Sequence, residues 1–321
     1  MLASLLPTIA LAAFATAQDP DAVRRIGDDK LYTLGKNCVA LADTLAQIAT
    51  KVEQSPNRYR NLELGAWQAL ALDAHGANLR YGHRKDAFRK LIAWLRMGMQ
   101  PNQTPTTVDE NTPRELHLLA TFAVARAQRE SDYKLLQRAV QGGWSDVRDK
   151  FTRDGAAPAT SREAALLVMF AQTMQQWRWP RFEIEAIQIA TDAVTAIPPG
   201  RDKLADAVRH QLERLTGTEH PADLTIAICW PGDVARDPFQ AVFAAFVTRS
   251  LPPKVRERQW QSVEPWISVR AKDGLWDVPG DGDRNLLAAR ILAVIGMSHE
   301  PKGFVEFEPK QPKDDSEYAF R

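Results

Sequence analysis

Apolar residues recur at helical spacing along most of the chain. Between residues 31 and 52 they lie three and then four positions apart, which places them on one narrow stripe of a helix. Further helices are predicted at about residues 61–76, 84–99, 182–197 and 202–215. No segment alternates apolar and polar residues as a half-buried strand does. The pattern therefore predicts an all-α protein with negligible strand content.

One twelve-residue segment occurs twice. Residues 112–123 (TPRELHLLATFA) return 48 positions later as 160–171 (TSREAALLVMFA), with seven of the twelve positions identical. Both copies show a capping-box pattern, in which the threonine hydroxyl accepts a first-turn N–H and the glutamate three residues on accepts the threonine N–H. Similar helix starts are predicted near 61, 237 and 284.

The spacing of the repeat predicts helix hairpins. A unit of about 48 residues has room for two helices and their connections, and such a unit buries its apolar face only against its neighbours. Stacked hairpins can close into an α/α toroid or form an open α-solenoid. Periodicity alone leaves both arrangements open.

The first 17 residues are expected to be a signal peptide. They contain no charged side chain and end in Ala15-Thr16-Ala17, which fits signal peptidase, although the usual basic residue is missing. The segment is short for a membrane span, which needs about 20 apolar residues. We expect an exported protein, periplasmic or extracellular, without an integral membrane span after cleavage. Residues 18–56 would be an amphipathic helix packed on the ring, 57–298 the repeat domain and 299–321 a polar tail.

Composition excludes several classes of protein. With 45% apolar and 25% charged residues, the chain can bury a large core. Lys plus Arg (41) and Asp plus Glu (40) nearly cancel, so the charge pattern of a nucleic-acid binder is missing. The two cysteines, Cys38 and Cys229, are too few for a disulfide framework, and whether they pair stays open. The six histidines lack metal-ligand spacing, so we expect no metal site and no cofactor.

Tryptophans and Asp-Gly turns recur beside the repeated helices. Trp144 precedes Asp154-Gly155, Trp266 precedes Asp273-Gly274-Leu275-Trp276, and Trp94 precedes Thr112. This order resembles the repeat of the squalene cyclase and prenyltransferase superfamily, whose members form α/α toroids. The resemblance implies that the turn glycine permits a bend and that the tryptophan wedges between hairpins, which would bury Trp276 against the Trp266 helix.

The catalytic motifs of that superfamily do not match this chain. The nearest string to the Asp-x-Asp-Asp motif of the cyclases is Asp281-Gly282-Asp283-Arg284, in which an arginine replaces the last carboxylate. Neither cysteine lies in the context of the prenyltransferase zinc ligands. The resemblance therefore implies the fold without the activity.

Two groups of charged residues are candidates for chemistry. Asp281 and Asp283 could act as acid and base, but capping a helix and neutralising Arg284 is the favoured interpretation. The second group is expected at the mouth of the ring, where it could bind an anionic or sugar ligand; a capping box with surface arginines is favoured instead. It consists of Arg114, Glu115, Arg162 and Glu163.

Two functions remain open. The first, favoured, is a non-catalytic binding or scaffold module for a polymer, peptide or protein. The second is a polysaccharide lyase or hydrolase, in which Asp281, Asp283 and Trp276 would line the central cavity with carboxyl groups roughly 5 to 10 Å apart. Tryptophans on connections, such as Trp177 and Trp179, could stack on sugars, although wedging between hairpins is favoured. The sequence leaves open whether the protein is an enzyme.

Overall fold

The computed structural model describes residues 58–75, 77, 79, 84–97, 108, 111–127, 133–217, 238–249, 271–272, 275–276 and 290. Most of this part is helical, and the all-α prediction is confirmed. The strands of the described part are two antiparallel pieces of two residues each, β1 (Ala271–Lys272) and β2 (Leu275–Trp276). The helices are α2 (Arg58–Ala74), α3 (Lys85–Met97), α4 (Arg114–Arg126), α5 (Tyr133–Thr152), α6 (Ser161–Gln176), α7 (Pro180–Thr195), α8 (Lys203–Leu215) and α10 (Pro238–Arg249).

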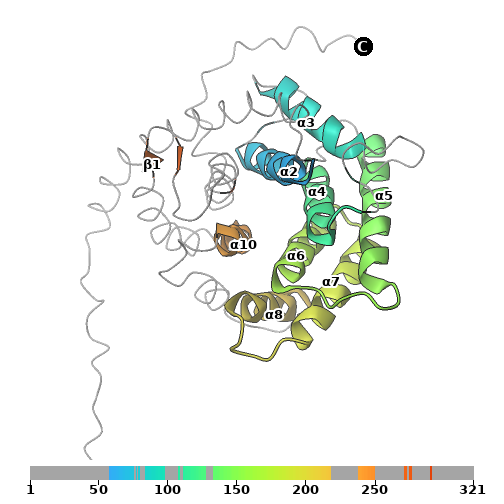
Figure 1. Cartoon of the computed structure of the whole chain (residues 1–321), viewed down its shortest axis with the longest axis vertical. Helices are drawn as coiled ribbons and strands as arrows, with labels where there is room; N and C mark the ends of the chain where they lie inside the picture. The colour runs from blue at the N-terminus through green and yellow to red at the C-terminus, as the bar shows by residue number, and fades with distance from the viewer. Residues whose placement is uncertain are drawn as a thin grey trace, which may run out of the picture.

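The helices form two rows. Consecutive helices pair as the hairpins α2–α3, α4–α5 and α6–α7, and every second helix packs on the next, α2 on α4, α4 on α6 and α6 on α8. Figure 1 shows α2, α4, α6 and α8 along a curved inner row, with α3, α5 and α7 outside it. The hairpin repeat predicted from the duplicated segment is therefore present.

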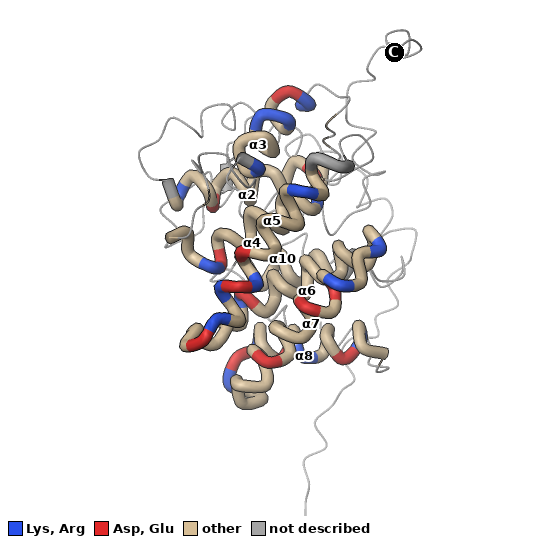
Figure 2. The backbone as a smooth tube through the Cα atoms, turned by 90° about the vertical axis from the view of Figure 1, so that its right-hand side faces the viewer, with Lys and Arg blue, Asp and Glu red and all other residues tan. Residues whose placement is uncertain are grey.

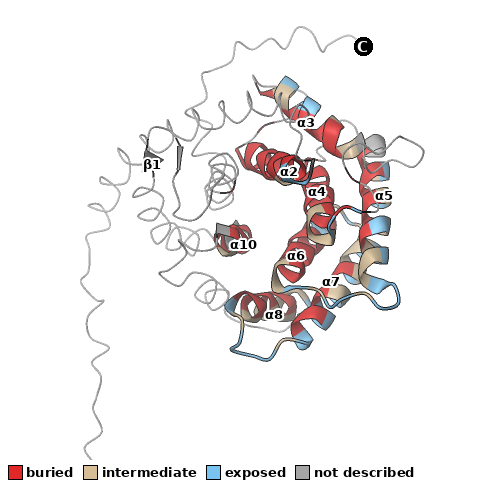
Figure 3. Cartoon of the chain, in the orientation of Figure 1, coloured by how far each residue is buried: buried red, intermediate tan, exposed pale blue. Residues whose placement is uncertain are grey.

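The inner helices are buried on both sides. Every residue of α4 from His117 to Arg126 is buried, and so is every residue of α6 from Glu163 to Met174, whereas α7 in the outer row buries only four residues (Figure 3). A helix that is apolar all round must be covered all round. The outer row covers one side of these helices.

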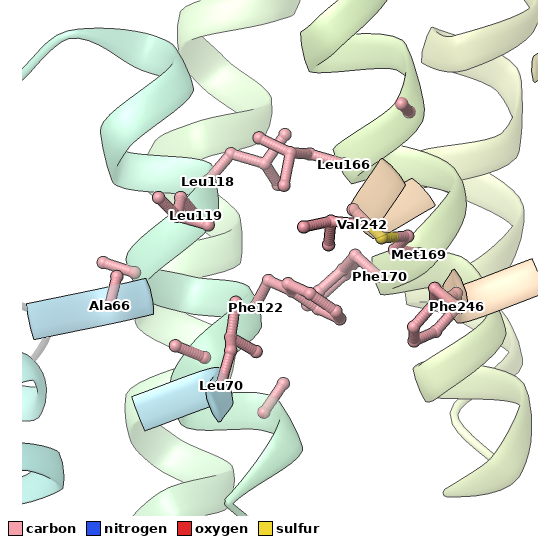
Figure 4. Packing of buried hydrophobic residues seen from close by; sticks show 14 of the residues in the cluster. Ala66, Leu70, Leu118, Leu119, Phe122, Leu166, Met169, Phe170, Val242 and Phe246 are labelled. Atoms are coloured by element: carbon pink, nitrogen blue, oxygen red, sulfur yellow. The ribbon is translucent and has the colours of Figure 1, made fainter. Parts of the chain in front are cut away.

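Helix α10 covers the other side. The Phe239 ring lies 6.0 Å from the Trp67 ring of α2, and the Phe246 ring lies 5.8 Å from the Phe122 ring of α4, both edge to face. In Figure 4, Val242 and Phe246 point toward side chains of α4 and α6. Apolar side chains therefore fill the space enclosed by α2, α4, α6 and α10.

Tryptophans wedge between helices where the structure describes them. Trp144 of α5 is 1% exposed, stacks on Phe170 of α6 with the ring centroids 4.8 Å apart, and donates from Nε1 to Glu185 of α7 at 2.7 Å. Trp177 and Trp179 are partly buried and pack against the same core. Trp144 thus packs between the α4–α5 and α6–α7 hairpins, as the wedging interpretation predicts.

Turn and cap residues explain where several helices begin and end. Gly155 follows α5 with φ +75°, a conformation that costs little only for glycine, as the Asp154-Gly155 pattern predicted. Asp202 caps α8 by accepting the N–H groups of Leu204 and Ala205. At α6 the capping box of Thr160 and Glu163 is complete.

The capping box predicted on Thr112 and Glu115 is wrong. Pro113 keeps an extended conformation, with φ −51° and ψ 137°, so α4 begins at Arg114, one position later than α6 begins in the second copy. Glu115 is therefore the second helical residue rather than the third. Its carboxylate is therefore not at the helical position that would accept a hydrogen bond from the Thr112 N–H.

Several predictions concern residues outside the described part. They include the signal peptide of residues 1–17, the helix of 31–52, the tail of 299–321 and both cysteines. The backbone of Trp276 belongs to β2, but its predicted burial, like the positions of Asp281, Asp283 and Arg284, lies outside the described residues. None of the described helices is both long enough and apolar enough to cross a bilayer.

Helices α2 and α3 approach closely at Gly65. A methyl group there would lie 2.6 Å from Cζ3 of Trp94 and 3.3 Å from Cδ1 of Leu91. We expect Gly65→Ala to lower the free energy of unfolding by roughly 1–3 kcal/mol, because overpacking outweighs the better helix propensity of alanine. Urea denaturation of the purified variant measures this.

The control is the same substitution beside a smaller neighbour. In a Trp94→Leu background, Gly65→Ala should cost much less, because the ring that it would meet is gone. An equal loss of stability in both backgrounds would show that the Trp94 contact is not the cause.

Candidate functional site

Charged side chains gather at one end of the inner row. Two ion pairs show that the inner helices run in the same direction. Arg114 in the first turn of α4 contacts Glu163 in the first turn of α6. Asp73 near the end of α2 forms a buried ion pair with Arg126 at the end of α4, at 3.0 Å. Figure 2 shows long uncharged stretches in these helices, with charged positions toward their ends. We call the following residues the charged cluster: Glu63, Arg114, Glu115, Arg162, Glu163 and Arg290.

Arg114 and Glu163 join the two copies of the repeat. Nε and Nη2 of Arg114 donate to the two carboxylate oxygens of Glu163, each at 2.7 Å, which is a bidentate pair. The same guanidinium donates to the carbonyls of Ala157 and Pro158 and lies 4.2 Å from the Phe151 ring. With side chains 15% and 6% exposed, the pair is mostly buried. Arg114 is thus not the surface arginine that the cap interpretation predicted.

Arg290 and Glu63 form a second ion pair. Nη2 of Arg290 donates to Oε1 of Glu63 on α2, and the guanidinium lies 5.6 Å from the Trp67 ring. The side chain of Arg290 is 10% exposed and that of Glu63 is 26% exposed. The two residues are 227 positions apart in the sequence, so the contact joins the first described helix to the last described residue.

Glu115 belongs to neither of these ion pairs. It is half-buried, and no hydrogen bond joins it to any residue of the described part. Burial raises the pKa of its carboxyl group above the ordinary 4.5; the charges of Glu163 and Glu63 raise it further, and those of Arg162 and Arg290 offset part of the rise. Its environment therefore opposes the charged form.

Arg162 borders Glu115 on the α6 side. Its guanidinium lies 5.1 Å from the Phe239 ring of α10 and is the cation with the strongest charge interaction with Glu115. Aromatic faces thus support Arg114, Arg162 and Arg290, which holds the guanidinium groups in place.

The cluster combines acceptors with donors and has no net charge. Ionised carboxylates only accept hydrogen bonds and guanidinium groups only donate them, and four of the six groups already pair with each other as Arg114–Glu163 and Arg290–Glu63. Among the residues that the structure describes, no group of three His, Cys, Asp or Glu could hold a metal ion.

The repeat identified four of the six cluster residues. Arg114, Glu115, Arg162 and Glu163 lie together as expected. Glu63 and Arg290 were missed, because neither belongs to the Arg-Glu pattern and they meet only through the fold. The other candidates, Asp281, Asp283, Arg284 and the side chain of Trp276, lie outside the described residues.

A separate hollow lies between the connection at residues 196–203 and Gln240 of α10. Its volume is about 520 Å³, and its charged residues are Arg201, Asp202 and Lys203. Asp202 already caps α8.

The Arg114–Glu163 pair should contribute strongly to stability. We expect Arg114→Met to cost about 3 kcal/mol, because it leaves a buried carboxylate without its partner. Adding Glu163→Gln should cost much less than it does in the wild type. A double-mutant cycle by urea denaturation measures the coupling, and additive effects would contradict the inter-repeat role of the pair.

Removal of the Glu115 charge should stabilise the fold at neutral pH. A carboxyl group whose pKa is raised in the folded state reduces stability as pH rises from the unfolded pKa through the folded one. Glu115→Gln should therefore raise the free energy of unfolding at about pH 7, and the gain should shrink at about pH 3, where the wild-type carboxyl is protonated in both states. Urea unfolding at both pH values measures it; a gain independent of pH would contradict the assignment.

Comparisons of the chain with protein-family models, with curated proteins and with solved structures found no match.

Proposed function

We propose that this protein is an exported, non-catalytic binding module of α/α-toroid type, which holds a polymer, peptide or protein ligand against the charged cluster. The observation that carries the proposal is the filled centre of the inner row. Phe122, Phe239 and Phe246 meet Trp67 and the aliphatic side chains of α4 and α6 there. The charged side chains of α4 and α6 lie near the ends of these helices.

The packed centre favours binding over catalysis. A toroid enzyme of the alternative class needs carboxyl groups facing each other across a central cleft. Between Glu115 and Arg126, α4 has no Asp, Glu, Lys or Arg, and α6 has none after Glu163. Among the described inner helices, the space that would hold a substrate is occupied by apolar side chains.

Two contacts support closure of the row into a ring. The pair Arg290–Glu63 brings residue 290 against the first described helix, and α10 packs on both α2 and α4 as well as on α6. Both arrangements are expected of a toroid, in which the last inner helix meets the first. The resemblance of the Trp and Asp-Gly motifs to the squalene cyclase and prenyltransferase repeat agrees with this proposal.

Glu115 is the observation that favours the alternative, a polysaccharide lyase or hydrolase. A half-buried carboxyl group with a raised pKa, close to Glu63 and Glu163, has the environment of a general acid. Asp281, Asp283 and Trp276, the other residues assigned to that activity, have side chains outside the described residues.

An array experiment tests the binding function. Labelled full-length protein is applied to arrays of oligosaccharides and of peptides, together with Glu115→Gln and the control Glu183→Gln. Glu183 is an acidic first-turn residue of the outer helix α7. We expect a defined set of ligands that the wild type and Glu183→Gln bind and Glu115→Gln loses.

Two results would overturn the proposal. The first is binding that Glu115→Gln leaves unchanged, which would remove the charged cluster from recognition. The second is cleavage of a bound oligosaccharide during incubation, detected by mass spectrometry, which would favour the lyase or hydrolase.

A further inference from the structure

We propose that the charged cluster recognises a neutral, polyhydroxylated ligand, an oligosaccharide unit, with Glu115 accepting hydrogen bonds from its hydroxyl groups. This inference rests on the proposed binding function and assigns it a ligand class and a contacting residue.

The charge balance of the cluster favours neither sign of charge in a ligand. Glu63, Glu115 and Glu163 face Arg114, Arg162 and Arg290, and Glu115 interacts with charges of both signs on α2, α6 and Arg290. The carboxylates repel an anion and the guanidinium groups attract it, and the reverse holds for a cation, so the two contributions largely offset each other. A neutral ligand needs no net charge in the site.

Two of the three carboxylates are already engaged. Glu163 accepts two bonds from Arg114 and one from the Thr160 N–H, and Glu63 is paired with Arg290. If either acid were drawn away to a ligand, its largely buried guanidinium partner would lose its ion pair. Glu115 therefore has the greatest unused accepting capacity of the three.

Burial makes a hydroxyl donor valuable at Glu115. A half-buried carboxylate has lost part of its water, and its charged form is disfavoured until other donors replace that water. Adjacent sugar hydroxyls can donate to both of its oxygens while adding no net charge. They can also accept hydrogen bonds from arginine side chains at the edge of the site.

The difference between the two repeat copies agrees with a special role for Glu115. In the second copy, Glu163 closes the capping box and binds Arg114. In the first copy, α4 begins one residue later, so Glu115 closes no capping box, and it belongs to neither described ion pair of the cluster. The same sequence motif thus supplies a structural carboxylate in one hairpin and an available carboxylate in the next.

Titration calorimetry of the full-length protein tests the ligand class. The probes are three neutral oligosaccharides (hexamers of N-acetylglucosamine, glucose and mannose), a cationic hexamer of glucosamine and an anionic hexamer of galacturonate. We expect at least one neutral hexamer to bind and both charged hexamers to bind more weakly. Glu115→Gln should weaken the neutral hexamer about tenfold or more, the usual effect of losing a charge-assisted hydrogen bond.

The controls separate recognition from folding. Glu183→Gln should bind the neutral hexamer like the wild type, and circular dichroism should show the same helix content for all three proteins. Neutral binding in the wild type should weaken as pH falls through the raised pKa of Glu115, and Glu115→Gln should lack this dependence.

The outcomes distinguish this inference from the function on which it rests. A charged hexamer that binds best, or neutral binding that ignores Glu115, overturns the sugar assignment. Peptide binding on the array that requires Glu115, with no hexamer bound in calorimetry, overturns it as well but leaves the binding module in place. Absence of any ligand in both experiments overturns both proposals.

Discussion

The arrangement of this protein depends on covering its inner helices from both sides. From Leu118 to Ala125, α4 carries only apolar residues and one threonine, and the Thr121 hydroxyl bonds back to the His117 carbonyl. The outer row and α10 together remove this surface from water, which is the main favourable contribution to folding. Because a charge inside such packing is costly, the charged residues of α4 and α6 are confined to the helix ends. The position of the candidate site follows from this constraint.

The ion pairs at the helix ends determine which helices lie side by side and how far they are shifted along their axes. Arg114 reaches across to the next copy of its own motif, so one repeated dipeptide supplies the arginine of one hairpin and the glutamate of its neighbour. At the opposite end, Asp73 and Arg126 join α2 to α4. Such pairs add little stability relative to apolar packing, but breaking them is costly, so they favour one alignment of the hairpins over slipped ones.

Local patterns predicted the elements of this fold better than its contacts. The duplicated segment located the starts of α4 and α6 to within two residues, and Asp202 marked the start of α8, because caps and periodicity act over one helical turn. The capping box on Thr112 failed for a local reason, the extended Pro113. The contacts of Glu63 with Arg290 and of Trp67 with Phe239 could not be predicted, because they join distant positions that no local periodicity relates.

The filled centre changes what the resemblance to the toroid cyclases can imply. In a toroid enzyme that binds its substrate in the interior, acidic side chains must line that interior, and the surrounding side chains must leave space for the substrate. Here the sides of α4 and α6 that face α10 carry leucine, phenylalanine and methionine. On the proposed function, a ligand would therefore meet the ends of the inner helices, where the two copies of the repeat each carry an Arg-Glu dipeptide and where Glu115 belongs to neither described ion pair. The later start of α4 removes Glu115 from the capping role that Glu163 fills at α6.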